Sequence, residues 1–147
     1  MTDDPDRGGP PLNIQALDHV VLRCSDLEAT LAFYGDVLGC VVERILEEEG
    51  LYQLRAGASL IDLVPVGSPL GGSNPPESDQ FNVAHICLRI DPPDWEQLTA
   101  YLKQRGIPAG DIRTRYGADG FGASIYVRDP EGNQVELKAG VIDDNDA

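Results

Sequence analysis

The stretch His19-Val20-Val21-Leu22-Arg23 is repeated with changes as His85-Ile86-Cys87-Leu88-Arg89, and this repeat is the strongest indication of the fold. These two histidines are the only ones among the 147 residues. Each pentapeptide leads into a helical pattern that ends at a glycine, Gly39 in the first copy and Gly106 in the second. Internal self-similarity of this kind predicts two modules with the same local structure.

A carboxylate lies late in each copy. Asp62 lies in Ile61-Asp62-Leu63, and Glu136 lies in Val135-Glu136-Leu137. Two imidazoles and two carboxylates at matching places in a repeat are a set of groups that binds divalent metals well. We therefore expect one shared metal site near a pseudo-two-fold axis.

Hydrophobic periodicity predicts the order βαβββ in each copy. Ser25 or Asp26 can cap the first helix, and the Asp-Pro-Glu-Gly sequence at 129–132 is a strong turn signal. The expected elements of the first copy are a strand at 17–24, a helix at 26–38 and strands at 41–46, 51–55 and 59–64. Those of the second copy are a strand at 83–90, a helix at 94–105 and strands at 112–115, 123–128 and 133–138.

The expected fold class is therefore α+β. The domain comprises residues 17–138, with one module at 17–66, a Gly/Pro/Ser-rich linker at 67–82 and a second module at 83–138. The acidic segments 1–16 and 139–147 are expected to be disordered tails. Side chains alternate between the two faces of a strand, so the histidines and carboxylates share the face opposite the uniformly apolar one. The apolar face is expected to pack on the helices, and the polar face to line the concave side of the sheet.

Composition limits the possible partners. The formal charge of −14 argues against nucleic acid and anionic membranes, which both require clustered Lys and Arg. No apolar run approaches the roughly 20 residues of a membrane span. Cys24, Cys40 and Cys87 are odd in number and lack C-x-x-C spacing, which is typical of buried small residues in a reducing compartment. We expect a cytoplasmic protein with a small-molecule substrate.

Two phrases resemble the vicinal oxygen chelate superfamily, which includes glyoxalase I, extradiol dioxygenases, fosfomycin-resistance enzymes, methylmalonyl-CoA epimerase and bleomycin-binding proteins. The first is Leu17-Asp18-His19-Val20-Val21-Leu22, followed by Asp26-Leu27 and by Phe33-Tyr34 to Gly39. The second is the stretch from Tyr126 to Leu137. The resemblance covers most of residues 17–138. It implies that the two modules form a cupped, open mixed β-barrel with the helices outside.

In the metal-dependent members of that superfamily, each first strand supplies a histidine or its equivalent and each last strand supplies Glu or Gln. His19, Asp62, His85 and Glu136 match these positions one by one. The resemblance thus implies a divalent metal, with Zn, Ni, Mn, Co and Fe all suited to such ligands. Residue 62 departs from glyoxalase I, which usually has the longer Glu there, so that an Asp is expected further from the metal, bound through water, or beside an open coordination position. A salt bridge from Asp62 to an inward-facing arginine is the alternative.

The function most consistent with these features is a metal-dependent lyase or isomerase of the glyoxalase-like group, similar to lactoylglutathione lyase. The substrate would chelate the metal through adjacent oxygens, and the cation would stabilise developing negative charge. Glu136 is the first candidate for the base that moves the proton, by resemblance to glyoxalase I, and Asp62 is the second.

Three further residues are candidates for substrate binding. Arg23 and Arg89 lie four residues beyond their histidines, or about 13 Å at about 3.3 Å per residue, so they are too distant to ligate the same metal. They would either anchor an anionic substrate tail or form ion pairs at the far end of the barrel. Tyr126 would either hydrogen-bond a metal-bound oxygen or pack in the core. Phe33 and Tyr34 are expected in the core.

Other functions within the superfamily remain open at this point. An extradiol-type dioxygenase would use His19, His85 and Glu136 with Fe(II) or Mn(II), but such enzymes often have four modules. A non-catalytic binding or resistance protein would generally lack the metal ligands. Thiol transfer to fosfomycin needs only three His or carboxylate ligands. A homodimer is expected, and the metal site lies either within one chain or between two.

Overall fold

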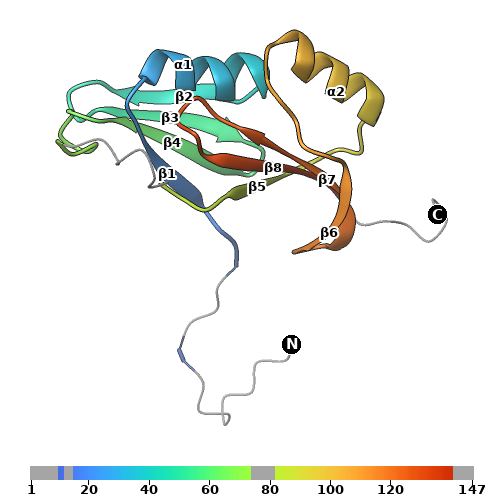
Figure 1. Ribbon diagram of the computed structural model, residues 1–147. Coiled ribbons are helices and arrows are strands. Elements are labelled where there is room, and N and C mark those ends of the chain that lie inside the picture. Colours follow the sequence, from blue (N-terminus) through green and yellow to red (C-terminus); the bar gives the residue numbers. More distant parts are fainter. Residues whose placement is uncertain (1–9, 12–14, 74–81, 141–147) are drawn as a thin grey trace.

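The computed structural model describes residues 10–11, 15–73 and 82–140. It contains two four-stranded mixed sheets with the strand orders β1-β4-β3-β2 and β5-β8-β7-β6 (Figure 1). The expected fold class is confirmed: each module is a βαβββ unit, and the sheets are cupped but do not close into a barrel. Most of the two acidic end segments lies outside the described residues, as do residues 74–81 of the expected linker.

The first module begins with β1 (His19–Cys24) and the helical segment α1 (Leu27–Leu31) with η2 (Ala32–Val37). Its sheet is completed by β2 (Val41–Leu46), β3 (Leu51–Ala56) and β4 (Ser59–Pro65). β1 runs parallel to β4, and the other pairings are antiparallel. A β-bulge between Val42 and Arg44 shifts the register of the outer strand β2.

The second module repeats this arrangement. Its elements are β5 (Ile86–Ile90), α2 (Trp95–Gln104), β6 (Arg113–Gly117), β7 (Gly120–Arg128) and β8 (Gln134–Ala139). β5 runs parallel to β8, whereas β7 is antiparallel to both β6 and β8. β5 begins three residues later than expected, so that His85 lies directly before the strand, and its first residue, Ile86, pairs with Val135 of β8.

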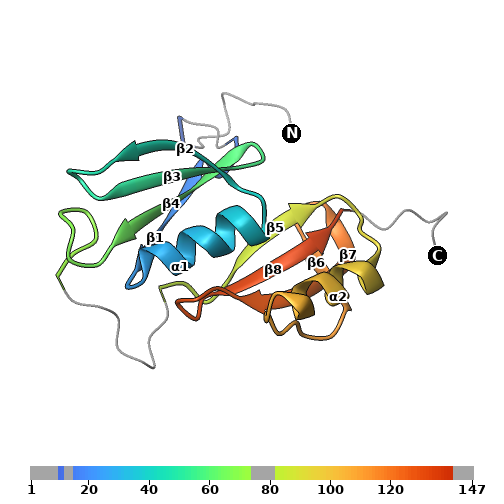
Figure 2. The same cartoon turned by 90° about the horizontal axis from the view of Figure 1, so that it is seen from above.

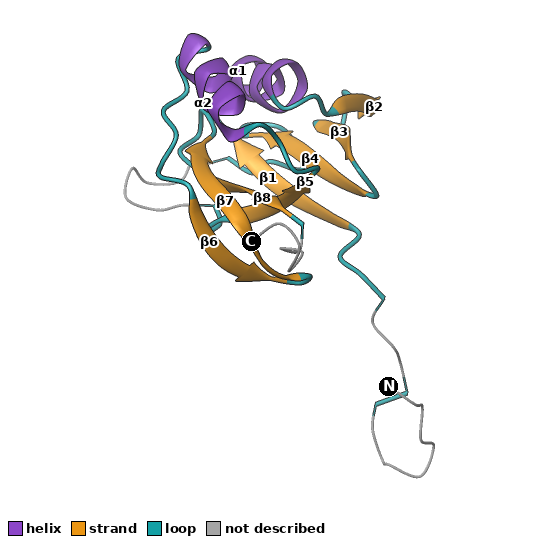
Figure 3. Cartoon of the chain, turned by 90° about the vertical axis from the view of Figure 1, so that its right-hand side faces the viewer, coloured by secondary structure: helices purple, strands orange, loops and turns teal. Residues whose placement is uncertain are grey.

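Both helices lie on the same side of the two sheets, and the strands curve away beneath them (Figures 2 and 3). The alternating apolar residues of the strands meet the helices in one continuous core, as the sequence predicts. Its buried members come from both modules: Leu22, Cys24, Phe33, Tyr34, Leu54, Ile61, Leu63, Leu102, Ile125, Val127, Val135 and Leu137. The modules therefore share one core and form a single unit. No described helix is long and apolar enough to cross a membrane.

The first helix differs from the expectation of one α-helix over 26–38. It starts as expected, with the Asp26 carboxylate accepting a hydrogen bond from the N–H of Ala29, but it widens into a π-helix after Leu31. The backbone N–H of Leu38 bonds to the carbonyl of Phe33, five residues earlier. Sequence periodicity does not distinguish the two windings, because both place an apolar stripe on the core.

A buried carboxylate joins the two modules. Asp129 is 5% exposed and lies in the turn between β7 and β8. Its Oδ1 accepts hydrogen bonds from the N–H groups of Glu131 and Asn133, at 2.9 and 2.8 Å. Its Oδ2 accepts from the Asn133 side chain and, at 2.7 Å, from the hydroxyl of Tyr34 in the other module. Gly132 has a φ of +85°, which the turn requires and which glycine adopts without strain.

A second contact supports the same junction. The Glu131 side chain accepts a hydrogen bond of 2.6 Å from the N–H of Asp26, at the start of the first helix. This N–H is one of the groups that a helix leaves unpaired at its N-terminus. The Asp-Pro-Glu-Gly-Asn turn thus contacts the start of the helical segment through Asp26 and its π-helical half through Tyr34. This explains physically why the turn and the first strand-helix phrase occur together.

We predict that Tyr34→Phe lowers the free energy of unfolding by about 1–3 kcal/mol, because it leaves a buried carboxylate oxygen with one donor fewer. Chemical denaturation with a single-transition fit measures this change. Tyr52→Phe on β3 is the matched control, since the Tyr52 hydroxyl makes no hydrogen bond within the described residues. Equal stabilities of the two variants would contradict the role given to the Tyr34–Asp129 bond.

Candidate metal site

The strand register places a histidine and a carboxylate in the same relation in both modules. Asp62 lies opposite Val21, two residues beyond His19, and Glu136 lies opposite Cys87, two residues beyond His85. His19 on β1 is thus diagonal to Asp62 on the neighbouring parallel strand, and His85, directly before β5, has the same relation to Glu136 on β8. Because the offset is two residues, both side chains lie on the face opposite the core. The repeat seen in the sequence is therefore also a repeat in three-dimensional register.

Asp18 orients the first histidine. The Nδ1 of His19 lies 2.7 Å from Oδ1 of Asp18, the preceding residue. This hydrogen bond to Asp18 raises the pKa of His19 above its ordinary value, and the charge of Asp62 also raises it. A carboxylate on one ring nitrogen leaves the other nitrogen as a lone-pair donor once the ring is neutral. Asp18 therefore fits the supporting role that carboxylates often have beside metal-binding histidines.

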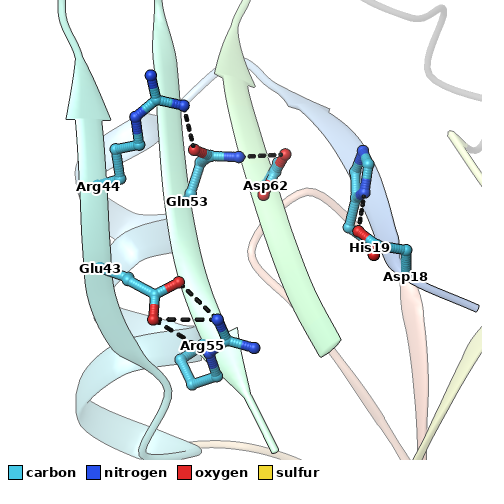
Figure 4. Close-up of polar contacts among 7 residues, drawn as sticks. All are labelled: Asp18, His19, Glu43, Arg44, Gln53, Arg55 and Asp62. Atoms are coloured by element: carbon cyan, nitrogen blue, oxygen red, sulfur yellow. Dashed lines mark hydrogen bonds and ion pairs between the residues drawn. The ribbon is translucent and has the colours of Figure 1, made fainter. Parts of the chain in front are cut away.

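The first carboxylate is held by an amide and not by an arginine (Figure 4). Asp62 is 2% exposed, and its Oδ2 accepts a hydrogen bond of 3.1 Å from the side chain of Gln53 on β3. Arg44 on β2 bonds the oxygen of Gln53 at 3.4 Å, so the arginine reaches Asp62 only through the amide. The direct salt bridge considered for Asp62 is absent from the described contacts. Its other oxygen, Oδ1, is buried without a hydrogen-bond partner.

The second pair is more compact. Oε1 of Glu136 lies 3.6 Å from Nε2 of His85. Two ligands bound at about 2.1 Å to one tetrahedral ion are roughly 3 to 3.5 Å apart, so this spacing is close to that of a ligand pair. Tyr126 lies opposite Glu136 on β7, and its ring packs edge-on against His85 at 5.7 Å between centroids. Burial, followed by the Glu136 carboxylate, raises the pKa of Tyr126.

The two carboxylates fit a cation better than they fit the surrounding protein. Glu136 is 5% exposed, and its Oε2 is buried without a partner, as is Oδ1 of Asp62. A buried polar atom without a hydrogen bond is costly, so such atoms are rare in stable proteins. A divalent metal bound at each pair would satisfy these oxygens, and the imidazoles beside them are common metal ligands. On these grounds the donor set fits a metal.

The two pairs do not meet within one described chain. Among residues 10–11, 15–73 and 82–140, no three His, Cys, Asp or Glu side chains lie close enough for one ion. Both histidines do line a single cavity of about 770 Å³ that lies between the two modules, whereas neither carboxylate does. The sequence predicts one site with all four ligands, whereas the two pairs lie apart within the described residues of one chain.

The two arginines considered for substrate binding have protein partners at the far ends of their strands. Nε of Arg23 donates to the carbonyl of Gly71 at 2.7 Å, in the segment after β4. Arg89 forms an ion pair with Asp119, in the turn between β6 and β7. Cys87 differs from the expectation of a buried cysteine, because it is exposed and lies opposite Glu136.

Two residues that contact the candidate ligands, Asp18 and Gln53, are not among the residues that the sequence predicts for the site. Asp18 directly precedes His19, and an acidic neighbour of a candidate ligand could have been noticed. Gln53 gives no such signal, because it contacts Asp62 only through strand pairing, which motif spacing does not reveal. Alternation places Gln53 on the polar face but does not select it among the other polar residues there.

Comparison with known proteins agrees with this geometry. Residues 16–137 match the family model described as the Glyoxalase/Bleomycin resistance protein/Dioxygenase superfamily. The chain is 33% identical to Virulence protein STM3117 of Salmonella typhimurium over 129 residues, which are 84% of this chain and 83% of that protein. The crystal structure of that virulence protein superposes with a TM-score of 0.72, covering 88% of this chain and all of the other.

Two similar proteins have names that state an activity. One is Metallothiol transferase FosB of Staphylococcus epidermidis, 27% identical over 134 residues, or 90% of this chain and 87% of the relative. The other is the crystal structure of lactoylglutathione lyase from Agrobacterium tumefaciens, with 25% identity, a TM-score of 0.62, and coverage of 86% and 95%. The family match spans most of the chain, and the paired His–carboxylate register agrees with it: this chain belongs to the Glyoxalase/Bleomycin resistance protein/Dioxygenase superfamily.

Proposed function

We propose that this protein is a metal-dependent lyase or isomerase that acts on a small substrate with adjacent oxygen atoms. The observation that supports it most is the pair of buried carboxylate oxygens without partners, Asp62 Oδ1 and Glu136 Oε2, each on the strand beside a histidine. His19, Asp62, His85 and Glu136 would hold one divalent ion such as Zn, Ni, Mn, Co or Fe. When bound, the ion would act as a Lewis acid toward the substrate oxygens.

The protein residues would carry the proton and position the substrate. Glu136 would take a proton from the substrate carbon at one carboxylate oxygen and return it at another position, with Asp62 as the alternative base. Burial suits this task, since Glu136 is 5% exposed and bulk water would be largely excluded from the proton transfer. Tyr126, packed between Glu136 and the His85 ring, would donate its hydroxyl proton to a substrate oxygen. Arg23 and Arg89 would contact more distant parts of the substrate.

We further propose that two copies of the chain complete the site. The His19–Asp62 pair and the His85–Glu136 pair do not gather around one point in the described chain, so each needs two more ligands. The outer strands and their hairpins also expose large apolar side chains. These are Val41, Val42 and Ile45 on β2, and Tyr116 and Phe121 at the β6–β7 hairpin. A second copy would cover such residues and supply the missing pair.

Metal-dependent thiol transfer is the second candidate. It is favoured by the similarity to Metallothiol transferase FosB over 90% of this chain. Such a reaction needs fewer protein ligands, so Asp62 would be dispensable for it. The two functions thus differ in what Asp62→Ala does: it impairs metal binding in the first and is tolerated in the second.

We predict that His85→Ala removes most of the bound metal, whereas Glu136→Gln keeps part of it. Glutamine retains an oxygen near the ion but cannot accept the proton, so turnover should fall by roughly 10²-fold or more. Elemental analysis measures metal content. Mass spectrometry in D₂O follows deuterium at the substrate carbon for hemithioacetals and for 2-oxo and 2-hydroxy carbonyl compounds. Glu48→Gln, in the exposed turn before β3, controls for the same chemical change.

Several results would contradict this proposal. Native metal content in both His19→Ala and His85→Ala would exclude the site. Oxygen uptake with ring cleavage of a catechol would favour an extradiol dioxygenase. Tight ligand binding without turnover by the metal-loaded protein would favour a sequestering protein.

We also predict that Asp18→Asn extends metal binding to lower pH. Protonated imidazole cannot ligate a metal, so affinity is lost as the pH falls through the pKa of His19. The hydrogen bond from Asp18 raises that pKa, so the loss begins at a higher pH than for an ordinary histidine. Asparagine removes this effect, and the midpoint should move down. Metal titrations from about pH 8 to about pH 5 measure it. Asp91→Asn, on an exposed residue after β5, should leave the midpoint unchanged.

A further inference from the structure

Basic residues are unevenly distributed over this acidic protein. Of 11 Lys and Arg residues, five have register positions on the concave face of the second module. These are Arg89, Arg113, Arg115, Arg128 and Lys138. Glu136 is the only acidic residue at the strand positions of that face. In a chain with a net charge of −14, such a local excess of cations predicts an anionic ligand.

Lys138 is the most unusual member of this group. It lies on β8 two residues beyond Glu136, on the same face, and is only 5% exposed. Its Nζ has one hydrogen-bond acceptor among the described residues, the carbonyl of Ala139, at the long distance of 3.4 Å. Lysine is rarely buried without a paired charge, because removing the ammonium group from water is costly. The position is thus unfavourable for a lysine with a purely structural role.

The first module provides an internal comparison. Arg23 lies opposite Val64 in that module, as Arg89 lies opposite Lys138 in the second. Val64 is 2% exposed, so the equivalent position of the fold accommodates an apolar side chain. The βαβββ architecture therefore does not require lysine there.

Two glycines make room for the lysine side chain. A Cβ added at Gly117 would lie 3.1 Å from Cε of Lys138, and one added at Gly122 would lie 3.1 Å from Nζ. These glycines are in the neighbouring strands β6 and β7. Because glycine has no side chain, neither residue occupies the space beside the ammonium group of Lys138.

Arg89 is the second cation of this region. It pairs in register with Lys138, so two positive side chains lie directly opposite each other on neighbouring strands. Like charges in this arrangement repel unless an anion compensates them. The carboxylate of Asp119 provides partial compensation by pairing with Arg89. The Arg89 side chain is 68% exposed, and it also lines the cavity that contains both histidines.

We propose that Lys138 and Arg89 form a binding site for an oxyanion, and that the substrate carries a carboxylate or a phosphate-type group there. Arg89 would exchange Asp119 for the ligand, while Lys138 would gain a charged partner, which it lacks among the described residues. The site would lie about 7 Å along β8 from Glu136, at about 3.3 Å per residue, within reach of a small substrate bound at the metal. This inference rests on the proposed function in one respect: the proposed function identifies the bound anion as part of the substrate.

The test measures binding of inorganic phosphate and of acetate to metal-free protein, by two-dimensional amide NMR titration. Saturable binding of either anion is expected. The anion that binds identifies the class: tetrahedral phosphate-type or planar carboxylate. Lys138→Met should weaken that binding roughly tenfold or more, since a charge-assisted hydrogen bond is lost. Asp119→Asn should strengthen it, because the competing carboxylate is removed.

Matched variants separate this site from general charge effects. Arg113→Gln removes one positive charge from the same face, and Asp111→Asn removes the carboxylate paired with Arg113. Both should leave the dissociation constants within about twofold of native. Thermal unfolding should show that Lys138→Met is at least as stable as the native protein, because methionine replaces a buried charge that has no carboxylate partner in the part of the chain that the structure describes.

The proposal is overturned if neither anion shows saturable binding, or if Lys138→Met binds as the native protein does. It is also overturned if Lys138→Met and Arg113→Gln weaken binding equally. Because no metal is present in this experiment, a failure of the anion site does not affect the metal proposal. Absence of bound metal in the native protein would equally leave the anion result unchanged.

Discussion

The structure depends on the buried carboxylate of Asp129, which accepts four hydrogen bonds and connects the two modules. Three donors belong to its own turn, and the fourth is the Tyr34 hydroxyl of the other module. A carboxylate taken out of water must have all its partners, so this turn and the first helix have one favourable arrangement. That arrangement sets how the two sheets lie relative to each other. It therefore also sets the direction in which the His–carboxylate pairs face.

The two modules share a backbone plan but differ in charge. The first holds its carboxylate with a neutral amide, Gln53, while the second places an aromatic hydroxyl, Tyr126, at the equivalent position on the neighbouring strand. The difference continues beyond the carboxylates, where Val64 corresponds to Lys138. A metal needs similar donors from both halves, whereas an asymmetric substrate needs different surroundings on its two sides. In the proposed function, the repeat would supply the metal ligands, and its asymmetry would serve the recognition of a substrate.

Much of the fold could be predicted from the sequence, because strand alternation and helix periodicity are local properties. The element order, the turn at 129–132 and the apolar face of the strands are confirmed. The π-helical half of the first helix could not be predicted, since it keeps the same residues on the core. The contact of Gln53 with Asp62 and the burial of Lys138 could not be predicted either. Both result from cross-strand pairing, which the spacing of residues in the sequence does not reveal. The predicted burial of Cys87 is wrong. Cysteine composition favours burial, but Cys87 lies on the concave face of its strand, where it is exposed.

We propose that one ion is held by His19 and Asp62 of one copy and by His85 and Glu136 of another. Mixing His19→Ala with His85→Ala protein, after unfolding and refolding together, distinguishes this arrangement from a site within one chain. Each variant alone should bind little metal. The mixed dimers should contain one site with all four ligands and one with neither histidine, so metal binding should return to about half of the native amount per mixed dimer. No recovery of bound metal in isolated mixed dimers would contradict a site shared between two chains.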